Sequence, residues 1–122
     1  MSIHKPLLLL LLLALTACGE PVPVYKSAYI GEWQAPEMYL LITPAGQVTC
    51  KQYKNSGTVS VKGPLRTFQG DDFTVGYGFF TTTFTVAIPP YLNEDATWRM
   101  VVNGVELIRT KRLWPVGKGI MV

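Results

Sequence analysis

The chain has 122 residues, of which 11 are lysine or arginine and 8 are aspartate or glutamate, and its net charge is +3 at pH 7. Hydrophobic residues make up 48% of it, a fraction typical of a globular protein rather than a disordered one. The single histidine, His4, lies within the leader of residues 1–17, so the chain after that leader cannot use a Ser-His or Cys-His nucleophile or an imidazole metal site.

Residues 1–17 have the pattern of an export signal. Lys5 supplies a positive charge, and seven consecutive leucines, Leu7 to Leu13, follow it closely. This apolar run is too short to cross about 30 Å of hydrocarbon as a helix, but it is typical of the core of a signal peptide. We therefore expect residues 1–17 to be removed, which leaves 105 of the 122 residues.

The leader ends in Leu15-Thr16-Ala17-Cys18, which resembles the lipobox of bacterial lipoproteins. The resemblance implies that Cys18 becomes the new N-terminus and carries a diacylglyceryl thioether, with a third acyl chain in Gram-negative bacteria. Two or three acyl chains give a durable membrane anchor, since each buried CH₂ contributes about 0.8 kcal/mol. Gly19 stands where Asp would favour inner-membrane retention, so the expected location is the periplasmic face of the outer membrane.

The chain after the leader divides into three parts. Residues 18–26 include Pro21 and Pro23 and are expected to form the lipidated N-terminus and a short extended stalk. Residues 27–114 are expected to form the folded domain. Residues 115–122 form a C-terminal tail, and the basic segment from residue 110 onward either rests on anionic headgroups or packs as a last short strand that ends near Trp114.

Cys50 is the second cysteine of the chain. If lipid occupies Cys18, then Cys50 has no partner for an internal disulfide bond. It lies in a run that alternates like a strand, where a small buried hydrophobic residue is the simplest interpretation. An intermolecular or reactive thiol is the alternative.

The composition of residues 27–114 favours short strands. After the leader the chain has 12 valines and 11 threonines but only 6 leucines, with frequent Gly and Pro. Apolar residues recur with period two in several runs, and turn residues separate them. The runs are Phe73 to Tyr77, Val59 to Val61 and Phe80 to Ile88, and the turn signals are Pro44-Ala45-Gly46, Asn55-Ser56-Gly57, Lys62-Gly63-Pro64 and Gly70-Asp71-Asp72. Pro89-Pro90 is expected to forbid further pairing after Ile88.

Asn103-Gly104 is the clearest hairpin signal, because both central residues of a type I′ turn need positive φ. The predicted register follows: Val102 faces Val105, Met100 faces Leu107 and Trp98 faces Arg109 on the buried side, while Val101 faces Glu106 and Arg99 faces Ile108 on the other. Together these signals predict an all-β fold, an antiparallel up-and-down meander of about eight short strands that forms a small barrel or flattened barrel.

Gly31-Glu32-Trp33 and Arg109 resemble a feature of lipocalins and the wider calycin group. In that group the first strand carries Gly-x-Trp, and the last strand supplies an arginine that lies over the tryptophan. The resemblance implies a closed meander whose first and last strands are neighbours, and a structural cation–π contact between Trp33 and Arg109 worth about 0.5–2 kcal/mol.

No catalytic motif is evident, so we expect no enzyme activity and no cofactor, metal or nucleic-acid partner. Two roles remain open. In the first, the barrel binds a small apolar ligand or lipid, and Phe84, Val86, Met100 and Leu107 line the binding space. In the second, a barrel filled by its own side chains acts as a structural or adaptor protein and presents a β surface to a cell-envelope protein.

Overall fold

The structure is a computed structural model that describes residues 20–110, and nearly all regular structure in this part of the chain is β-strand. The elements are η1 Val24–Tyr29, a 3-10 helix, and the strands β1 Gly31–Ala35, β2 Met38–Ile42, β3 Gln47–Lys54, β4 Gly57–Gln69, β5 Asp72–Tyr77, β6 Phe80–Phe84, β7 Val86–Leu92, β8 Trp98–Val102 and β9 Val105–Arg109. The predicted all-β antiparallel meander is confirmed, with nine strands instead of about eight.

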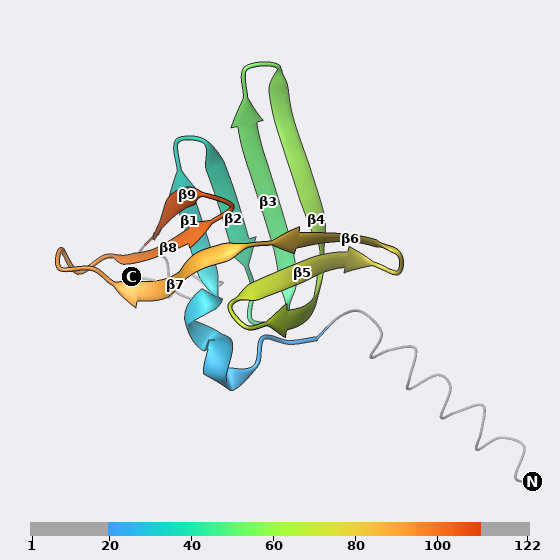
Figure 1. Ribbon diagram of the computed structural model, residues 1–122, viewed down its shortest axis with the longest axis horizontal. Coiled ribbons are helices and arrows are strands. Elements are labelled where there is room, and N and C mark those ends of the chain that lie inside the picture. Colours follow the sequence, from blue (N-terminus) through green and yellow to red (C-terminus); the bar gives the residue numbers. More distant parts are fainter. Residues whose placement is uncertain (1–19, 111–122) are drawn as a thin grey trace, which may run out of the picture.

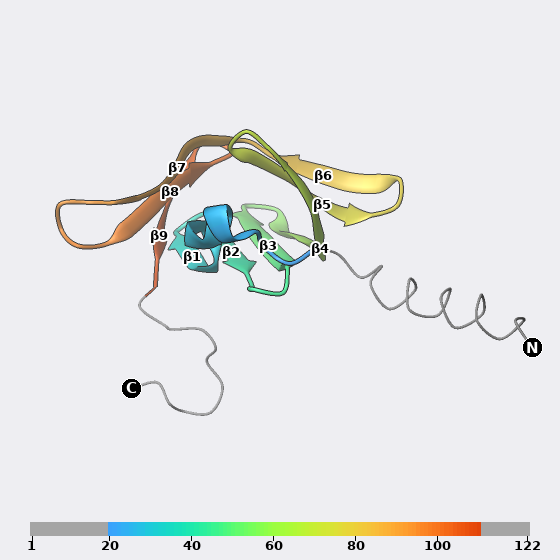
Figure 2. The same ribbon diagram turned by 90° about the horizontal axis from the view of Figure 1, so that it is seen from below.

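The strands form one sheet in the order β6-β5-β4-β3-β2-β1-β9-β8-β7, and this sheet curls into a half-barrel (Figures 1 and 2). The first and last strands, β1 and β9, are paired neighbours, as the meander predicts. The two free edges belong to β6 and β7, which only Thr85 separates and which continue one another across the sheet (Figure 1). Because two strands that run on in one direction cannot pair as a hairpin, the sheet stays open there.

The concave side of the sheet holds a single hydrophobic core. Burial alternates along the strands as the period-two pattern predicts; in β2, for example, Met38, Leu40 and Ile42 are buried and the residues between them are partly exposed. Aromatic rings pack within the core, and Phe73 and Phe84 stack with their centroids 5.0 Å apart. The buried hydrophobic residues are Tyr29, Trp33, Met38, Leu40, Ile42, Val48, Cys50, Leu65, Phe73, Val75, Phe84, Val86, Met100, Val102 and Leu107.

The β8–β9 hairpin has the predicted register. Met100 pairs with Leu107 and Val102 pairs with Val105, and this side of the hairpin faces the core. Asn103 and Gly104 have φ angles of 49° and 81°, as a type I′ turn requires.

The turn predicted at Lys62-Gly63-Pro64 is wrong, because these residues lie within β4. This strand is 13 residues long and changes partner at the predicted turn: Pro64 is the last residue paired with β3, and Leu65 is the first paired with β5. Gly63 allows a close approach to β5, since a Cβ there would lie 3.2 Å from the Cα of Gly76. Gly63-Pro64 therefore marks a bend inside a strand.

The expectation that Pro89-Pro90 ends strand pairing is also wrong. β7 includes both prolines, and pairing continues with Tyr91 opposite Arg99. The register shifts between Ile88 and Tyr91, so the prolines occupy an irregular part of an edge strand, where a missing N–H group costs no ladder hydrogen bond. A second register shift, between Val86 and Ile88, turns Ile88 towards solvent, although the sequence pattern places it on the face of Phe84.

The described part of the expected stalk packs against the sheet. The N–H of Glu20 donates to the carbonyl of Leu65 at 3.4 Å, and the N–H of Val22 donates to the carbonyl of Pro44 at 3.2 Å. Gly46 leaves room for this segment, because a Cβ at position 46 would overlap the carbonyl of Glu20. From Glu20 onward the chain is therefore docked on the domain instead of standing free of it.

Candidate functional site

Trp33 lies in the middle of β1 with its side chain fully buried in the core. Its indole Nε1 donates a hydrogen bond of 3.0 Å to the carbonyl oxygen of Tyr29, the last residue of η1. The bond satisfies the one polar group of the indole, which burial would otherwise leave without a partner. It also connects η1 to the first strand of the sheet.

Arg109 lies opposite Trp33 at the end of β9. Its Cζ atom is 5.7 Å from the centroid of the Trp33 ring and 5.0 Å from the centroid of the Trp98 ring, so the guanidinium contacts two indoles. Partial burial lowers the pKa of Arg109 from its usual value. The group nevertheless stays charged at neutral pH, because a guanidinium does not lose its proton in proteins.

Gly31 provides the space that the Arg109 side chain occupies. A Cβ at position 31 would lie 2.7 Å from Cδ of Arg109, and the φ angle of Gly31 is +144°, which side-chain-bearing residues rarely adopt. Arg109 thus contacts both Gly31 and Trp33, with which it carries the calycin resemblance. Trp98 is a further member of this cluster, since its ring also contacts Arg109. The predicted hairpin register, which places Trp98 opposite Arg109, was the feature of the sequence that pointed to it.

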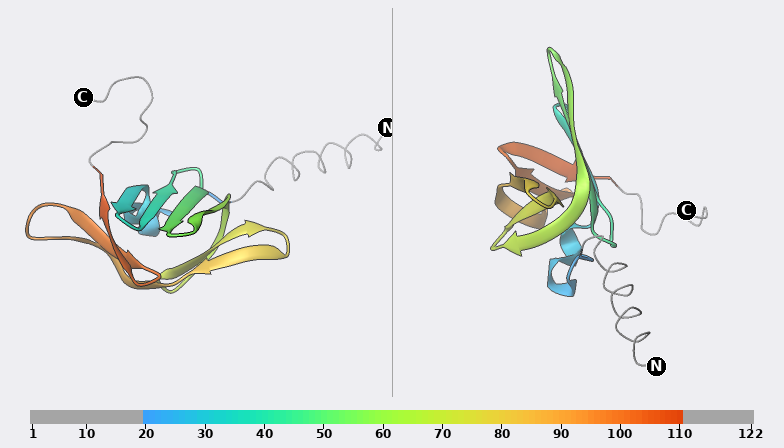
Figure 3. Two further views of the ribbon diagram at one scale, coloured as in Figure 1. Left: turned by 90° about the horizontal axis from the view of Figure 1, so that it is seen from above. Right: turned by 90° about the vertical axis from the view of Figure 1, so that its right-hand side faces the viewer.

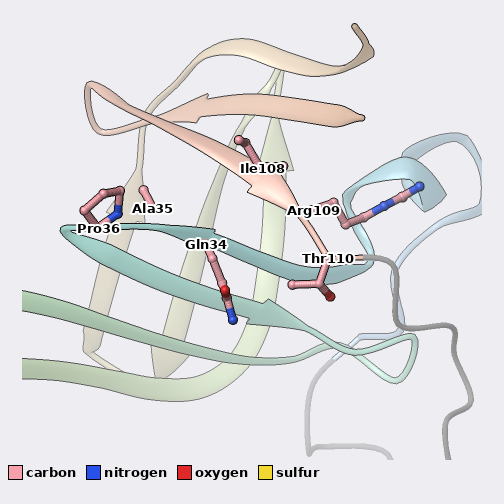
Figure 4. A pocket seen from close by; sticks show the side chains of 6 residues that line it. All are labelled: Gln34, Ala35, Pro36, Ile108, Arg109 and Thr110. Atoms are coloured by element: carbon pink, nitrogen blue, oxygen red, sulfur yellow. The ribbon is translucent and has the colours of Figure 1, made fainter. Parts of the chain in front are cut away.

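A groove of about 460 Å³ opens on the surface beside this cluster (Figure 4). It lies where β1 and β9 separate: Gln34 pairs with Ile108, but no pairing of Ala35 with β9 follows. The Arg109 side chain points away from the other residues of the groove, towards η1 (Figure 4). We name this the β1–β9 groove; its lining residues are Gln34, Ala35, Pro36, Ile108, Arg109 and Thr110.

Hydrogen bonds hold one end of the β1–β9 groove in place. The N–H of Thr110 donates to the backbone carbonyl of Glu32 at 2.8 Å, and the Thr110 hydroxyl donates to Glu32 Oε1 at 3.2 Å. The hydroxyl of Tyr39 donates to the other carboxylate oxygen, Oε2, at 2.7 Å. Sequence reasoning missed this groove, because its position depends on where two strands far apart in the sequence stop pairing.

The four residues expected to line a ligand space, Phe84, Val86, Met100 and Leu107, come together from β6, β7, β8 and β9. All four are buried and belong to the core cluster, where they pack against neighbouring side chains. None of them lines the β1–β9 groove. Their arrangement is that of packing residues.

Cys18, the expected lipid anchor, lies outside the described residues. Within residues 20–110, no helix has the length and hydrophobicity needed to cross a membrane. The same part of the chain holds no cluster of three or more Cys, Asp or Glu side chains placed to bind a metal ion.

Comparison of the chain with protein-family models, curated proteins and solved structures gives no match. The resemblances to bacterial lipoproteins and to calycins therefore rest on the residues quoted for them.

Proposed function

We propose that the protein is an exported lipoprotein, anchored through lipid on Cys18 to the periplasmic face of the outer membrane. Its β domain acts without catalysis as a structural or adaptor module that contacts another cell-envelope protein. The leader and Leu15-Thr16-Ala17-Cys18 support the anchor.

We choose the adaptor role because the residues that were expected to line a ligand space are buried. Phe84, Val86, Met100 and Leu107 are at most 5% exposed and are packed into the core. A carrier of small apolar ligands would use such side chains as the walls of a space of roughly 300 Å³ or more. Ligand binding remains the alternative prediction.

The β1–β9 groove is the surface that we assign to partner binding. β1 and β9 share only two paired positions, so Val105 to Leu107, which precede the groove residues in β9, have no partner in β1. An extended segment of a partner can add to such an edge through backbone hydrogen bonds. The partly exposed side chain of Ile108 adds an apolar contact there.

Lipidation is tested by mass spectrometry of the N-terminal peptide after expression of the full chain in a Gram-negative host. We expect cleavage before Cys18 and the mass of two or three acyl chains on that residue. The Cys18→Ser variant is the control and should carry none. An unmodified Cys18 in the exported wild-type protein would contradict the anchor.

The filled interior is tested by Met100→Ala. Truncation of a fully packed methionine should lower the free energy of unfolding by about 2–5 kcal/mol, measured by urea denaturation. The control Leu92→Ala removes a side chain that is 58% exposed and should change it by less than about 1 kcal/mol. A loss at Met100 no larger than at Leu92, together with lipid that copurifies with the Cys18→Ser protein, would favour the ligand carrier.

Partner binding is tested with a photo-crosslinking amino acid in living cells. Placed at Ile108 in the β1–β9 groove, the probe should give one discrete protein adduct, and Gln34→Glu should weaken that adduct. The matched probe at Val59, an exposed valine of β4, should not give the adduct. Identical adducts from both positions would exclude the groove as the contact surface.

A further inference from the structure

The hairpin of β5 and β6 exposes three aromatic side chains at its end. Tyr77 is 64% exposed, Phe79 is 98% exposed and Phe80 is 84% exposed. Tyr77 and Phe80 are paired across the hairpin, and Gly78 at the turn has a φ of 55°. We call residues 77–80 the aromatic tip. Hydrophobic surface gathered in this way on a soluble domain usually marks a contact with another apolar surface.

The two strands pair closely just below the aromatic tip. A Cβ at position 76 would overlap the carbonyl oxygen of Phe80, so β5 and β6 approach more closely than a side chain on Gly76 would allow. Phe79 and Phe80 follow this close approach, and their rings lie outside the core.

The β5–β6 hairpin has no charged residue after Asp72. The sequence has no Asp, Glu, Lys or Arg between Asp72 and Glu94, and the exposed part of β6 presents Thr81, Thr82 and Thr83. Exposed strands of soluble proteins usually carry charges that discourage association. Aromatic rings flanked by uncharged hydroxyl groups instead suit the boundary between headgroups and acyl chains, where Tyr and Trp gather in membrane proteins.

The fold places the aromatic tip close to the start of the described chain. Glu20 is hydrogen-bonded to Leu65 of β4, and Leu65 pairs with Val75 of β5, two residues before Tyr77. Cys18 precedes Glu20 by two residues, so their Cα atoms are at most about 7 Å apart. From Val75 to Tyr77, the last residue of β5, the strand advances about 7 Å, and the turn with Phe79 follows. Acyl chains on Cys18 would therefore enter a bilayer beside this hairpin, which projects on the same side as the start of the described chain (Figures 1 and 2).

Other exposed residues lie near the start of the described chain. Val24 and Tyr25 of η1 are exposed, and Tyr25 lines a surface groove together with Glu20 and Arg66, although η1 itself contacts Gly70 at the end of β5 away from the tip. An apolar residue, a tyrosine and an arginine suit the outer zone of a phospholipid surface. β9, whose residues Ile108 and Arg109 line the groove, lies on the opposite side of the molecule from β5 and β6 (Figures 1 and 3), so the tip and a partner in the groove do not compete for one surface.

We propose that the aromatic tip of the β5–β6 hairpin inserts into the headgroup region of the phospholipid membrane and serves, beside the lipid on Cys18, as a second contact that sets the orientation of the domain. This inference rests on the proposed lipid anchor. The exposed aromatic end of this hairpin, which has no charged residue after Asp72, and its place near the start of the described chain carry the inference.

The first experiment needs no lipidation. The mature chain with Cys18→Ser is mixed with vesicles of phosphatidylethanolamine and phosphatidylglycerol, and bound protein is measured by flotation. We expect binding that falls at least about tenfold in the Phe79→Ser/Phe80→Ser variant, because two rings no longer leave water. The matched control Ile88→Ser/Leu92→Ser removes two exposed apolar residues of β7 and should bind as the parent does. Equal binding by all three proteins would overturn the proposal.

The second experiment uses the lipidated protein in the same vesicles. An environment-sensitive fluorophore on Phe79→Cys should shift to the blue, whereas the same label on Leu92→Cys should not. Labelling is selective because Cys50 is buried. A label at position 79 that stays in water would overturn the proposal, and so would a chain that dimerises in solution through Phe79 and Phe80, because the tip would then bind a second copy.

The two experiments separate the inference from the proposed function. If Cys18 carries no lipid but the Cys18→Ser chain still binds vesicles through Phe79 and Phe80, the anchor fails and the aromatic tip stands. If Cys18 is lipidated and the label at position 79 stays in water, the anchor stands and the tip fails.

Discussion

The guanidinium of Arg109 contacts the rings of Trp33 and Trp98 within 6 Å, and its aliphatic part packs where Gly31 has no side chain. A cation over an indole face is attracted by the ring quadrupole, and partial removal from water strengthens the attraction. The cluster joins β1, β8 and β9, so this one side chain connects the first strand of the meander to its last hairpin.

Replacing Arg109 with Met should therefore lower the free energy of unfolding by about 0.5–2 kcal/mol, because methionine keeps most of the aliphatic packing but loses the charge over two rings. Urea denaturation followed by tryptophan fluorescence measures the change. The matched control is Arg66→Met, an exposed arginine of β4, which should change it by less than about 0.5 kcal/mol. Equal stability of the two variants would show that the stacking contributes nothing.

At the scale of elements, the β8–β9 turn does more than reverse the chain. The N–H of Asn103 donates to the carbonyl of Thr85, and Asn103 Oδ1 accepts a hydrogen bond from the N–H of Thr85. Thr85 is the single residue between β6 and β7, and the next N–H, that of Val86, donates to the Asp72 carboxylate at 2.8 Å. Side-chain oxygens of Asn103 and Asp72 thus accept hydrogen bonds from backbone N–H groups between β6 and β7, where the sheet is open.

Variants at Asn103 separate the contribution of its positive φ angle from that of its side-chain hydrogen bond. Asn103→Gly keeps the positive φ but removes the side-chain hydrogen bond, and should cost about 0.5–1.5 kcal/mol of unfolding free energy. Asn103→Ala should cost a further 1–2 kcal/mol or so, since alanine disfavours a φ of 49°. Asn103→Asp retains an acceptor and should be the most stable of the three. Chemical denaturation gives the order, and equal losses for Gly and Ala would disprove the turn contribution.

For the whole molecule, the free energy of unfolding should change with pH in the alkaline range, because two buried groups, a thiol and a phenol, can lose a proton there. Burial raises the pKa of the Cys50 thiol to about 11, and burial, with smaller contributions from Asp71 and Asp72, raises the pKa of Tyr29 to about 12. Both groups are neutral in the folded core, and their ordinary pKa values of 9.0 and 10.0 apply when the chain unfolds. Their stabilising contributions are complete below these ordinary values and are lost as pH rises through the folded ones.

We therefore expect the urea midpoint of unfolding to fall between pH 9 and pH 11 for Cys50, and between pH 10 and pH 12 for Tyr29. In Cys50→Ala the fall of the urea midpoint between pH 9 and pH 11 should become shallower. Both proteins contain the same lysines, so their contribution cancels in this comparison. Tyr25→Phe, at an exposed tyrosine, should leave the profile unchanged. A Cys50→Ala profile that parallels the wild type from pH 9 to pH 11 would contradict the assignment.

The sequence by itself was enough for the features that neighbouring residues control. Alternation of apolar and polar side chains predicted the strands, and Asn103-Gly104 predicted one hairpin to the residue, because side-chain direction and positive φ are local properties of the backbone. Glycine at position 31, with Trp33 and Arg109, also indicated which strands would be neighbours, and β1 and β9 do pair.

Only the tertiary structure decided which partners each strand has along its length and which apolar residues are buried. Gly63-Pro64 is a bend because β4 changes partner there, and Pro89-Pro90 is tolerated because β7 is an edge. Phe84 and Phe80 lie on the same strand, yet one is buried and the other projects past the core. Pairing and burial depend on residues far away in the sequence, so no local pattern could reveal the β1–β9 groove or the aromatic tip.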